Sequence, residues 1–280
     1  MEDRAAKDLF PSTFSRLATA YKRRLDEVMA RGEAHGRAAV IAWIEPAPGK
    51  RILDLACGPG TLSYPIARAV SPGGEVIGID LAPGMIELAR LEAPPGLPLT
   101  FELMDMEELR FPDHRFDAAV SGHGVQFVPD LRRAFMETRR VLKPGSRMAA
   151  SVPVDPVRLS EAQAILEQTV GGALPPAPKA RDQLATRRLV EDEESFAAVA
   201  KQAGFSVAEV VRYEESTSWA SPQHFVEMSA SWWSMALRLE GVSPSERAAL
   251  LDRARRAIEV ELGLGPLQTA GATNVLRAIV

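Results

Sequence analysis

The segment from residue 51 to residue 60 constrains the fold of this chain more than any other, and it reads R-I-L-D-L-A-C-G-P-G. An apolar run that leads into a glycine turn before a helix is typical of a buried parallel strand. Gly58 and Gly60 would let the backbone approach a ligand closely, and the N–H groups of the following helix would face that ligand. The segment therefore predicts a loop that binds a cofactor.

Further strands and helices alternate along the chain after this loop. The apolar runs and their turn residues predict strands over 51–55, 75–80, 99–104, 116–121, 148–152, 205–213 and 274–280. The helical pattern recurs between them, over 61–70, 82–91, 131–141 and 191–203. This alternation predicts an α/β fold with a doubly wound, seven-stranded, mostly parallel sheet of the Rossmann-like kind.

Segments that interrupt this rhythm predict helical lid insertions, because they are too long for simple connections. Residues 8–31 carry apolar side chains at helical spacing, with a possible cap or break at Ser12 and Thr13, and 34–44 predict a second helix. The expected division of the chain is a helical entrance or lid (1–45), a cofactor-binding core (46–153), a lid insertion (154–190), a continued core (191–218), a second helical insertion (219–265) and a final core strand (266–280).

Composition and charge exclude several classes of function. The 280 residues are 46% hydrophobic, and the single cysteine, Cys57, excludes an intrachain disulfide and a cysteine-cluster zinc site. The net charge of −4 with interspersed signs does not predict a nucleic-acid partner. His35, His114 and His224 lack metal-type spacing, so no metal is expected. A charged N-terminus and short apolar runs predict a cytoplasmic protein without a membrane span. The expected oligomeric state is a monomer or a homodimer.

Polar residues stand where four of the predicted strands end, and this is where open α/β sheets bind ligands. Asp80 lies 22 residues after Gly58, near the spacing at which a carboxylate receives the two hydroxyls of a ribose. Asp105 is then placed to meet the exocyclic amine of an adenine. A nicotinamide cofactor is the main alternative, but its G-x-G-x-x-G fingerprint needs a third glycine where this chain has Ser63. A nucleoside without phosphate fits this pattern better.

Five ordered motifs make the chain resemble the class I S-adenosylmethionine-dependent methyltransferases, and among them the ubiquinone/menaquinone-biosynthesis C-methyltransferases. The motifs are D-L-A-C-G-P-G (54–60), G-I-D (78–80), M-D-M-E-E-L-R-F-P (104–112), F-D-A-A-V-S-G-H (116–123) and V-L-K-P-G (141–145). The resemblance covers roughly residues 10–152 and extends to the rest of the chain only through strand order.

This resemblance implies S-adenosyl-L-methionine as the cofactor. Ala56 to Gly60 would line its methionine part, Asp80 and Leu81 would hold the ribose, and Ser121 would lie beside the sulfonium. The residues implied to bind the cofactor are Tyr21, Ala56, Cys57, Gly58, Gly60, Asp80, Leu81, Met85, Asp105, Met106 and Ser121. Two positions depart from the family pattern: Ala56 replaces the first glycine of the loop, and Lys22 replaces the acidic residue after Tyr21.

His123, at the end of the fourth strand, is the candidate catalytic base. Its ordinary pKa near 6.5 leaves the imidazole mostly neutral at cellular pH, so it could take a proton from an acceptor; the alternative role is to shape the pocket. Cys57 is expected to pack rather than react. Asp54 is expected to fix the N–H groups of the loop, and Tyr21 either closes over the cofactor or packs on the core.

The predicted pocket for the acceptor lies under an aromatic lid. Residues 222–262 predict two helices, the first of which carries Phe225, Met228, Trp232, Trp233 and Met235. Adjacent tryptophans diverge by about 100° on a helix, so one of them could line a substrate pocket or a subunit interface. An apolar lid favours a small or medium hydrophobic acceptor. The candidate substrate residues are Gln126, Phe127, Trp232 and Trp233.

The predicted function is therefore C- or O-methylation of a small or medium hydrophobic metabolite with S-adenosylmethionine. The alternatives are a cyclase or decarboxylase that retains the cofactor, a nicotinamide-dependent oxidoreductase, and a nucleoside-binding regulator without activity, because a fold alone does not fix a function.

Overall fold

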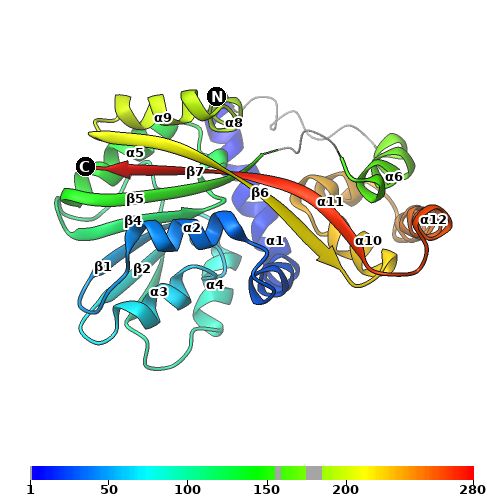
Figure 1. Ribbon diagram of the computed structural model, residues 1–280, viewed down its shortest axis with the longest axis horizontal. Helices are drawn as coiled ribbons and strands as arrows, with labels where there is room; N and C mark the ends of the chain where they lie inside the picture. Colours follow the sequence, from blue (N-terminus) through cyan, green and yellow to red (C-terminus); the bar gives the residue numbers. More distant parts are fainter. Residues whose placement is uncertain (1, 155–158, 175–184) are drawn as a thin grey trace.

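A seven-stranded sheet forms the centre of the computed structural model, which describes residues 2–154, 159–174 and 185–280 and, within them, all side chains except those of residues 2–6 and 233. The strand order is β3-β2-β1-β4-β5-β7-β6 (Figure 1). The strands are β1 (Arg51–Leu55), β2 (Glu75–Asp80), β3 (Leu99–Leu103), β4 (Phe116–Gly122), β5 (Leu142–Val154), β6 (Val207–Trp219) and β7 (Leu267–Ile279). Strands β1 to β5 pair in parallel, and β7 runs antiparallel to both β5 and β6. The predicted mostly parallel sheet is confirmed.

Apolar residues cover both faces of the central strands, as a parallel sheet between helices requires. Ile52 of β1 packs with α2 (His35–Ile44) and α3 (Ser63–Val70) on one face. Its neighbour Leu53 points the other way, toward a core shared with α5 (Leu131–Val141), α8 (Ala185–Glu191) and α9 (Glu193–Gln202). The helix α4 (Pro83–Leu91) follows β2, and the short η1 (Val125–Phe127) follows β4. The helices thus leave open the edge where β1, β2 and β4 end.

The long helix α1 (Glu2–Ala30) precedes the sheet and lies against α4 and α11. It is continuous from Glu2 through Pro11 to Ala30, so the expected cap or break at Ser12 and Thr13 is wrong in both forms. The hydroxyl of Ser15 accepts a hydrogen bond from the amide of Gly84 at 3.1 Å, which ties α1 to the first turn of α4.

A second apolar core lies away from the main sheet, where β6 and β7 extend as a long antiparallel ribbon (Figure 1). Both strands are 13 residues long, and they begin or end well beyond the predicted 205–213 and 274–280. The helices around this second core form the lid. They are α6 (Glu161–Thr169), η2 (Gly171–Ala173), α10 (Pro222–Ala230), α11 (Trp233–Glu240) and α12 (Pro244–Leu262).

The lid contains three helices over 222–262 where the sequence predicts two. Helix α10 ends because Ser231 closes it, with the Ser231 hydroxyl donating to the carbonyl of Met228 at 2.7 Å. Trp232 is then the N-cap residue of α11 and adopts an extended backbone. The two tryptophans therefore do not follow one another on a single helix, and the argument from their angular divergence does not apply. The side chain of Trp233 lies outside the described part of the structure.

Candidate functional site

A cavity lies at the carboxyl ends of β1, β2 and β4, between the glycine loop and helix α1. Of the residues predicted to bind the cofactor, those that line it are Tyr21, Ala56, Cys57, Gly58, Asp80, Leu81, Met85, Asp105 and Met106. Two do not line it. Ser121 is fully buried beneath the wall, and Gly60 faces away from the cavity. We call this space the first cavity.

The loop after β1 has the left-handed backbone that its small residues predict. Gly58 has φ of 54°, and a Cβ atom there would have no neighbour within 4 Å, which leaves its space free for a ligand. Gly60, with φ of 84°, serves packing instead, because a Cβ atom would come within 2.7 Å of the ring of Tyr64. Ala56 also has a positive φ, 50°, a conformation that favours the glycine it replaces.

Asp80 is held in place by two backbone amides. Gly58 donates to its Oδ2 and Ala82 to its Oδ1, both at 2.8 Å. Burial nevertheless raises the pKa of this carboxyl. Each oxygen retains a further lone pair, and Asp80 lines the first cavity, so the carboxylate can accept hydrogen bonds from a vicinal diol.

Asp54 has one paired and one unpaired oxygen. Its Oδ2 accepts from the hydroxyl of Ser63 at 2.5 Å, whereas Oδ1 is buried without a partner. Burial raises the pKa of Asp54 to about 7. The expectation that Asp54 fixes the loop N–H groups is wrong, because the amide of Cys57 bonds the carbonyl of Ile79 and that of Gly58 bonds Asp80. An unpaired buried carboxylate oxygen at a cavity wall suits a cation.

Asp105 follows β3 and is positioned by its own loop. Its Oδ1 accepts from the amide of Glu107 at 2.9 Å, and its Oδ2 lies 2.6 Å from Nζ of Lys7 on α1. Lys7 also bonds Glu107 at 2.6 Å, so α1 is fastened to this edge of the cavity by two ion pairs.

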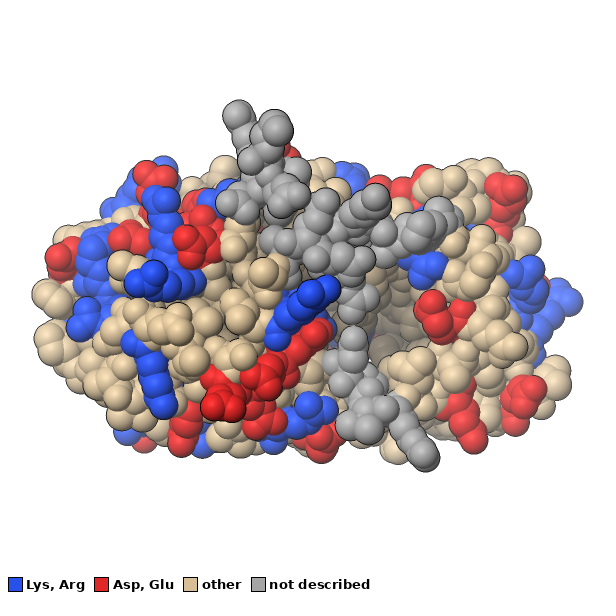
Figure 2. All heavy atoms as spheres, turned by 90° about the horizontal axis from the view of Figure 1, so that it is seen from above, with Lys and Arg blue, Asp and Glu red and all other residues tan. Residues whose placement is uncertain are grey.

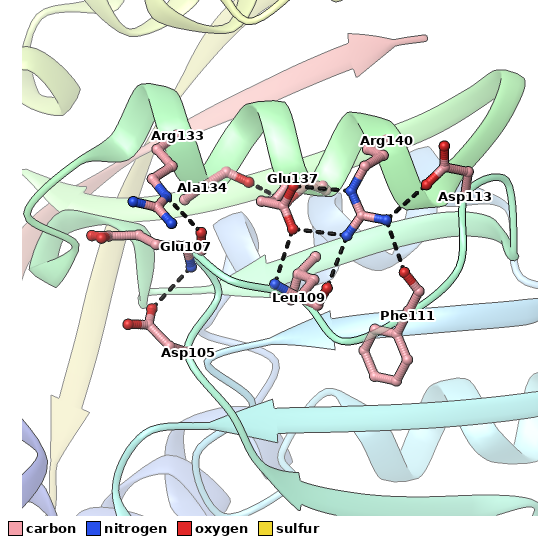
Figure 3. A network of polar contacts seen from close by, with 10 residues as sticks. Asp105, Glu107, Leu109, Phe111, Asp113, Arg133, Ala134, Glu137 and Arg140 are labelled. Atoms are coloured by element: carbon pink, nitrogen blue, oxygen red, sulfur yellow. Dashed lines mark hydrogen bonds and ion pairs between the residues drawn. The ribbon is translucent and has the colours of Figure 1, made fainter.

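The segment after Asp105 is braced against helix α5 (Figure 3). Arg140 donates to the carbonyls of Leu109 and Phe111, each at 2.8 Å, while Glu137 accepts from the amide of Leu109 at 3.0 Å. The side chains of Glu137 and Arg140 also bond one another. The segment after Asp105 belongs to no helix or strand, and this network holds it in place. It thereby helps to position Asp105.

His123 stands where the first cavity meets a second one. Its backbone is left-handed, with φ of 61°, and its Nε2 is buried without a hydrogen-bond partner. Burial, together with the charges of Arg37, Arg24 and Arg187, holds the pKa of His123 well below its usual value. The imidazole is therefore neutral near pH 7, and a free ring nitrogen can accept a proton or a hydrogen bond.

The second cavity lies between the ends of the strands and the lid. It is the larger of the two, with about 380 Å³ against about 130 Å³. Three of the four candidate substrate residues, Gln126, Phe127 and Trp232, line it. Trp219, Phe225 and Met235 add an apolar wall. Tyr21, Arg37, His123 and Phe127 line both cavities and so form their junction.

Helix α1 closes the outer side of this junction with aromatic rings. Phe14 packs edge-on against Tyr21 with 5.8 Å between ring centroids, and against Phe127 with 5.1 Å. Phe10 contacts Phe127 with 5.0 Å between ring centroids. Tyr21 packs in this cluster and also lines the first cavity, so its closure over a cofactor stays a prediction. Lys22 points elsewhere and pairs with Asp26 and Glu92.

Several residues of the site have no motif that would have revealed them. Arg24 and Arg37 line the second cavity from α1 and α2, and Thr61, whose buried hydroxyl lacks a partner, lines the first. Arg24 lies in a helix with many charged side chains, where an arginine normally indicates a solvated face, so its sequence context gives no signal. Arg37 is the one arginine in the otherwise largely apolar helix α2, and that isolated charge was the available signal. Thr61 directly follows the glycine turn and could have been included with it.

The chemistry of the first cavity fits a positively charged nucleoside. A diol can bind Asp80, a cation can bind the unpaired oxygen of Asp54, and Gly58 leaves room for close approach. Among the described residues, no group of three His, Cys, Asp or Glu side chains could hold a metal ion. Cys57 is buried, and its burial raises the pKa of the thiol well above the usual value, which disfavours the reactive thiolate.

Surface charge and helix composition bear on possible partners. Figure 2 shows Lys and Arg side chains mixed with Asp and Glu over the face it presents. None of the helices in the described part of the chain combines the length and apolar content needed to cross a membrane.

Comparison with known proteins identifies relatives of the central region. The family described as "Methyltransferase domain" matches residues 52–145. A 2-phytyl-1,4-naphtoquinone methyltransferase of Synechococcus elongatus is 33% identical over 147 residues, which are 51% of this chain and 63% of that protein. Aklanonic acid methyltransferase DauC of a Streptomyces species is 36% identical over 156 residues, which are 55% of this chain and 69% of that protein. The chain thus spans less than two thirds of the naphtoquinone enzyme.

A solved structure shares the fold. Phosphoethanolamine N-methyltransferase 2 of Haemonchus contortus, in complex with S-adenosyl-L-methionine, superimposes with a TM-score of 0.53 at 20% identity. The alignment covers 87% of this chain and 51% of that protein. At this identity the likeness concerns the fold alone.

Proposed function

The chain belongs to the S-adenosylmethionine-dependent methyltransferases, and from this membership we propose that it transfers the methyl group of S-adenosylmethionine to a carbon or oxygen atom of a small organic acceptor. The observation that carries the proposal is the junction of the two cavities at Tyr21 and His123. A cofactor in the first cavity and an acceptor in the second would meet at that point.

The residues of the first cavity would hold the cofactor by its three polar parts. Asp80 accepts from the ribose hydroxyls, and the loop at Ala56 to Gly58 lies along the methionine part. The buried Oδ1 of Asp54 receives the methionine ammonium group. Asp105 and Met106 line the end of the cavity that suits an adenine.

When bound, S-adenosylmethionine supplies a methyl group that its sulfonium charge has already activated. The protein then has to position the acceptor atom and exclude water, and it needs a base only if the acceptor carries a proton. Phe14, Tyr21 and Phe127 cover the junction and exclude water. In the tautomer with its proton on Nδ1, His123 accepts the acceptor's proton or hydrogen bond at Nε2.

The second cavity supports an acceptor with a hydrophobic body. Phe127, Trp219 and Trp232 offer aromatic surface, and relatives of the central region are named for a naphtoquinone and for aklanonic acid. We expect no nucleic-acid partner, a cytoplasmic location, and a monomer or homodimer. The boundaries predicted for the entrance, core and lid segments remain part of this proposal.

Methyl transfer can be measured directly with S-adenosylmethionine labelled in its methyl group. The purified chain is incubated with a library of aromatic acceptors that includes quinones and polyketide acids. We expect label in one class of acceptor and an equal amount of S-adenosylhomocysteine. Cofactor binding without transfer to any acceptor would favour a regulator or a cofactor-retaining cyclase. Stabilisation by NADH instead of S-adenosylmethionine would favour an oxidoreductase.

A further inference from the structure

Two arginines in the second cavity lack the carboxylate partners that buried guanidinium groups normally have. Arg37 of α2 is only 5% exposed, and its polar contact is the hydroxyl of Tyr21, to which it donates over 3.4 Å. Arg24 of α1 has a buried Nε without any hydrogen-bond partner. Within the described ranges, neither side chain forms an ion pair. A buried charge left unpaired is costly, so its presence needs an explanation.

Aromatic rings orient Arg24 without neutralising it. Its Cζ lies 3.6 Å from the ring centroid of Trp232 and 5.8 Å from that of Trp219. Burial, followed by the nearby charge of Arg37, lowers the pKa of Arg24 to about 9 while Tyr21 opposes this shift. At pH 7.5 the guanidinium still carries its charge. The stacking therefore presents a cation to the cavity in a fixed direction.

The remaining charged side chains around this cavity are engaged elsewhere. Glu215 accepts from the amide of Gly36 at 2.8 Å, and Glu167 lies 3.7 Å from Arg238. Arg187 pairs with Glu191 at 2.5 Å. Arg24 and Arg37 thus remain without an ion-pair partner among the described residues, beside the unpaired Nε2 of His123 and the unpaired Oε1 of Gln126.

We infer that the acceptor carries a carboxylate, which binds Arg24 and Arg37 while its aromatic body lies on the apolar wall of the second cavity. This inference rests on the proposed function and specifies its substrate class. A guanidinium group presents paired N–H donors that match a carboxylate, and desolvation inside the cavity strengthens the bond. The predicted hydrophobic acceptor is thereby refined to an aromatic acid. The arginines bind and orient this acid and take no part in the transfer step.

The test uses 2-naphthoate and its neutral counterpart 2-naphthamide as probes, which differ in charge but little in shape. Each is titrated calorimetrically into the full chain saturated with S-adenosylhomocysteine. We expect naphthoate to bind the wild type at least tenfold more tightly than naphthamide. In Arg24→Gln and Arg37→Gln this preference should fall below about threefold. Arg23→Gln is the matched control, because Arg23 lies on the same helix but outside the cavity, and it should keep the preference.

Two further readouts separate the possible failures. Affinity for S-adenosylhomocysteine should stay within about twofold in Arg24→Gln and Arg23→Gln, because neither residue lines the first cavity. Arg37 lines both cavities, so a cooperative thermal transition is the measurement that shows Arg37→Gln to be folded. Without ligand, Arg24→Gln should not lower the Tm, since it removes an unpaired charge. Equal binding of the two probes, no binding of either, or an unchanged preference in both cavity variants would overturn the inference. Failure of the wild type to bind S-adenosylhomocysteine would instead refute the proposed function.

Discussion

The amide of Gly58 donates to Oδ2 of Asp80 over 2.8 Å, and this bond joins the turn after β1 to the carboxylate at the end of β2. The two halves of the predicted nucleoside site are therefore one hydrogen-bonded unit. A second amide, that of Ala82, binds the other oxygen of Asp80. The carboxylate is fixed before any ligand arrives, so little entropy is lost when a ribose binds it.

Replacement of Asp80 by alanine should remove most of the affinity for the cofactor. Two charge-assisted hydrogen bonds to ribose hydroxyls contribute about 3 kcal/mol, which is roughly a hundredfold change in Kd. Calorimetric titration with S-adenosylhomocysteine measures this change. Glu102→Ala is the control. Glu102 lies on β3 opposite Ile79 of β2 in the strand register, but it does not line the cavity. Wild-type affinity in Asp80→Ala would refute the ribose assignment.

Asp54 should make cofactor affinity depend on pH. Burial raises the pKa of free Asp54 to about 7, and a bound ammonium group would lower it, so binding favours the ionised form. Affinity should be nearly constant just above pH 7 and should fall by up to about tenfold per pH unit below it. Asp80 also has a raised pKa, so Asp54→Asn isolates the effect of Asp54. That variant should bind more weakly and with a flatter profile between pH 5.5 and 7.5. A wild-type affinity that does not change over this range would contradict the ammonium assignment.

His123→Ala should lower kcat by about a hundredfold if the imidazole takes a proton from the acceptor. Its affinity for S-adenosylhomocysteine should change by less than about threefold. Because burial holds the pKa of His123 well below 6.5, kcat should show no rise through pH 6.5 that depends on this residue. His35→Ala is the control, because His35 is exposed at the start of α2. Unchanged turnover in His123→Ala would leave this residue with a packing role.

Arg140→Met should lower the free energy of unfolding by about 2 kcal/mol, since it removes charge-assisted hydrogen bonds to the segment after Asp105. The exposed fraction of the Arg140 side chain, 32%, keeps this value modest. Denaturant titration measures the loss. Arg132→Met on the same helix should stay within about 0.5 kcal/mol because Arg132 is exposed. Equal stability of the two variants would show that the network does not brace this loop.

The core of the fold was predictable because local pattern and global structure agree there. The buried run from Ile52 to Leu55, the glycine turn and the carboxylate after β2 each have a short-range signal, and the structure brings Gly58 and Asp80 together as that signal indicates. The parallel pairing of β1 to β5 followed from the alternation of strands and helices. These features depend on residues close in sequence.

The lid and the far ends of β6 and β7 were not predictable in the same way. The ribbon from Ser216 to Trp219 is paired with residues on β7 about 50 positions away, and it has no continuous apolar run of its own. The two arginines of the second cavity were not predicted either, because their burial also depends on contacts between residues far apart in the sequence. Arg24 and Arg37 belong to two different helices, and only tertiary packing buries them beside His123.

The measurement that tests the central claim most directly is a calorimetric titration of the wild-type chain with S-adenosylmethionine, S-adenosylhomocysteine and NADH. If the first cavity holds an adenosyl sulfonium between Asp54, Asp80 and Asp105, the two adenosyl ligands bind at one site per chain and NADH does not compete with them. Binding of NADH at that site, or no binding of either adenosyl ligand, would contradict this account.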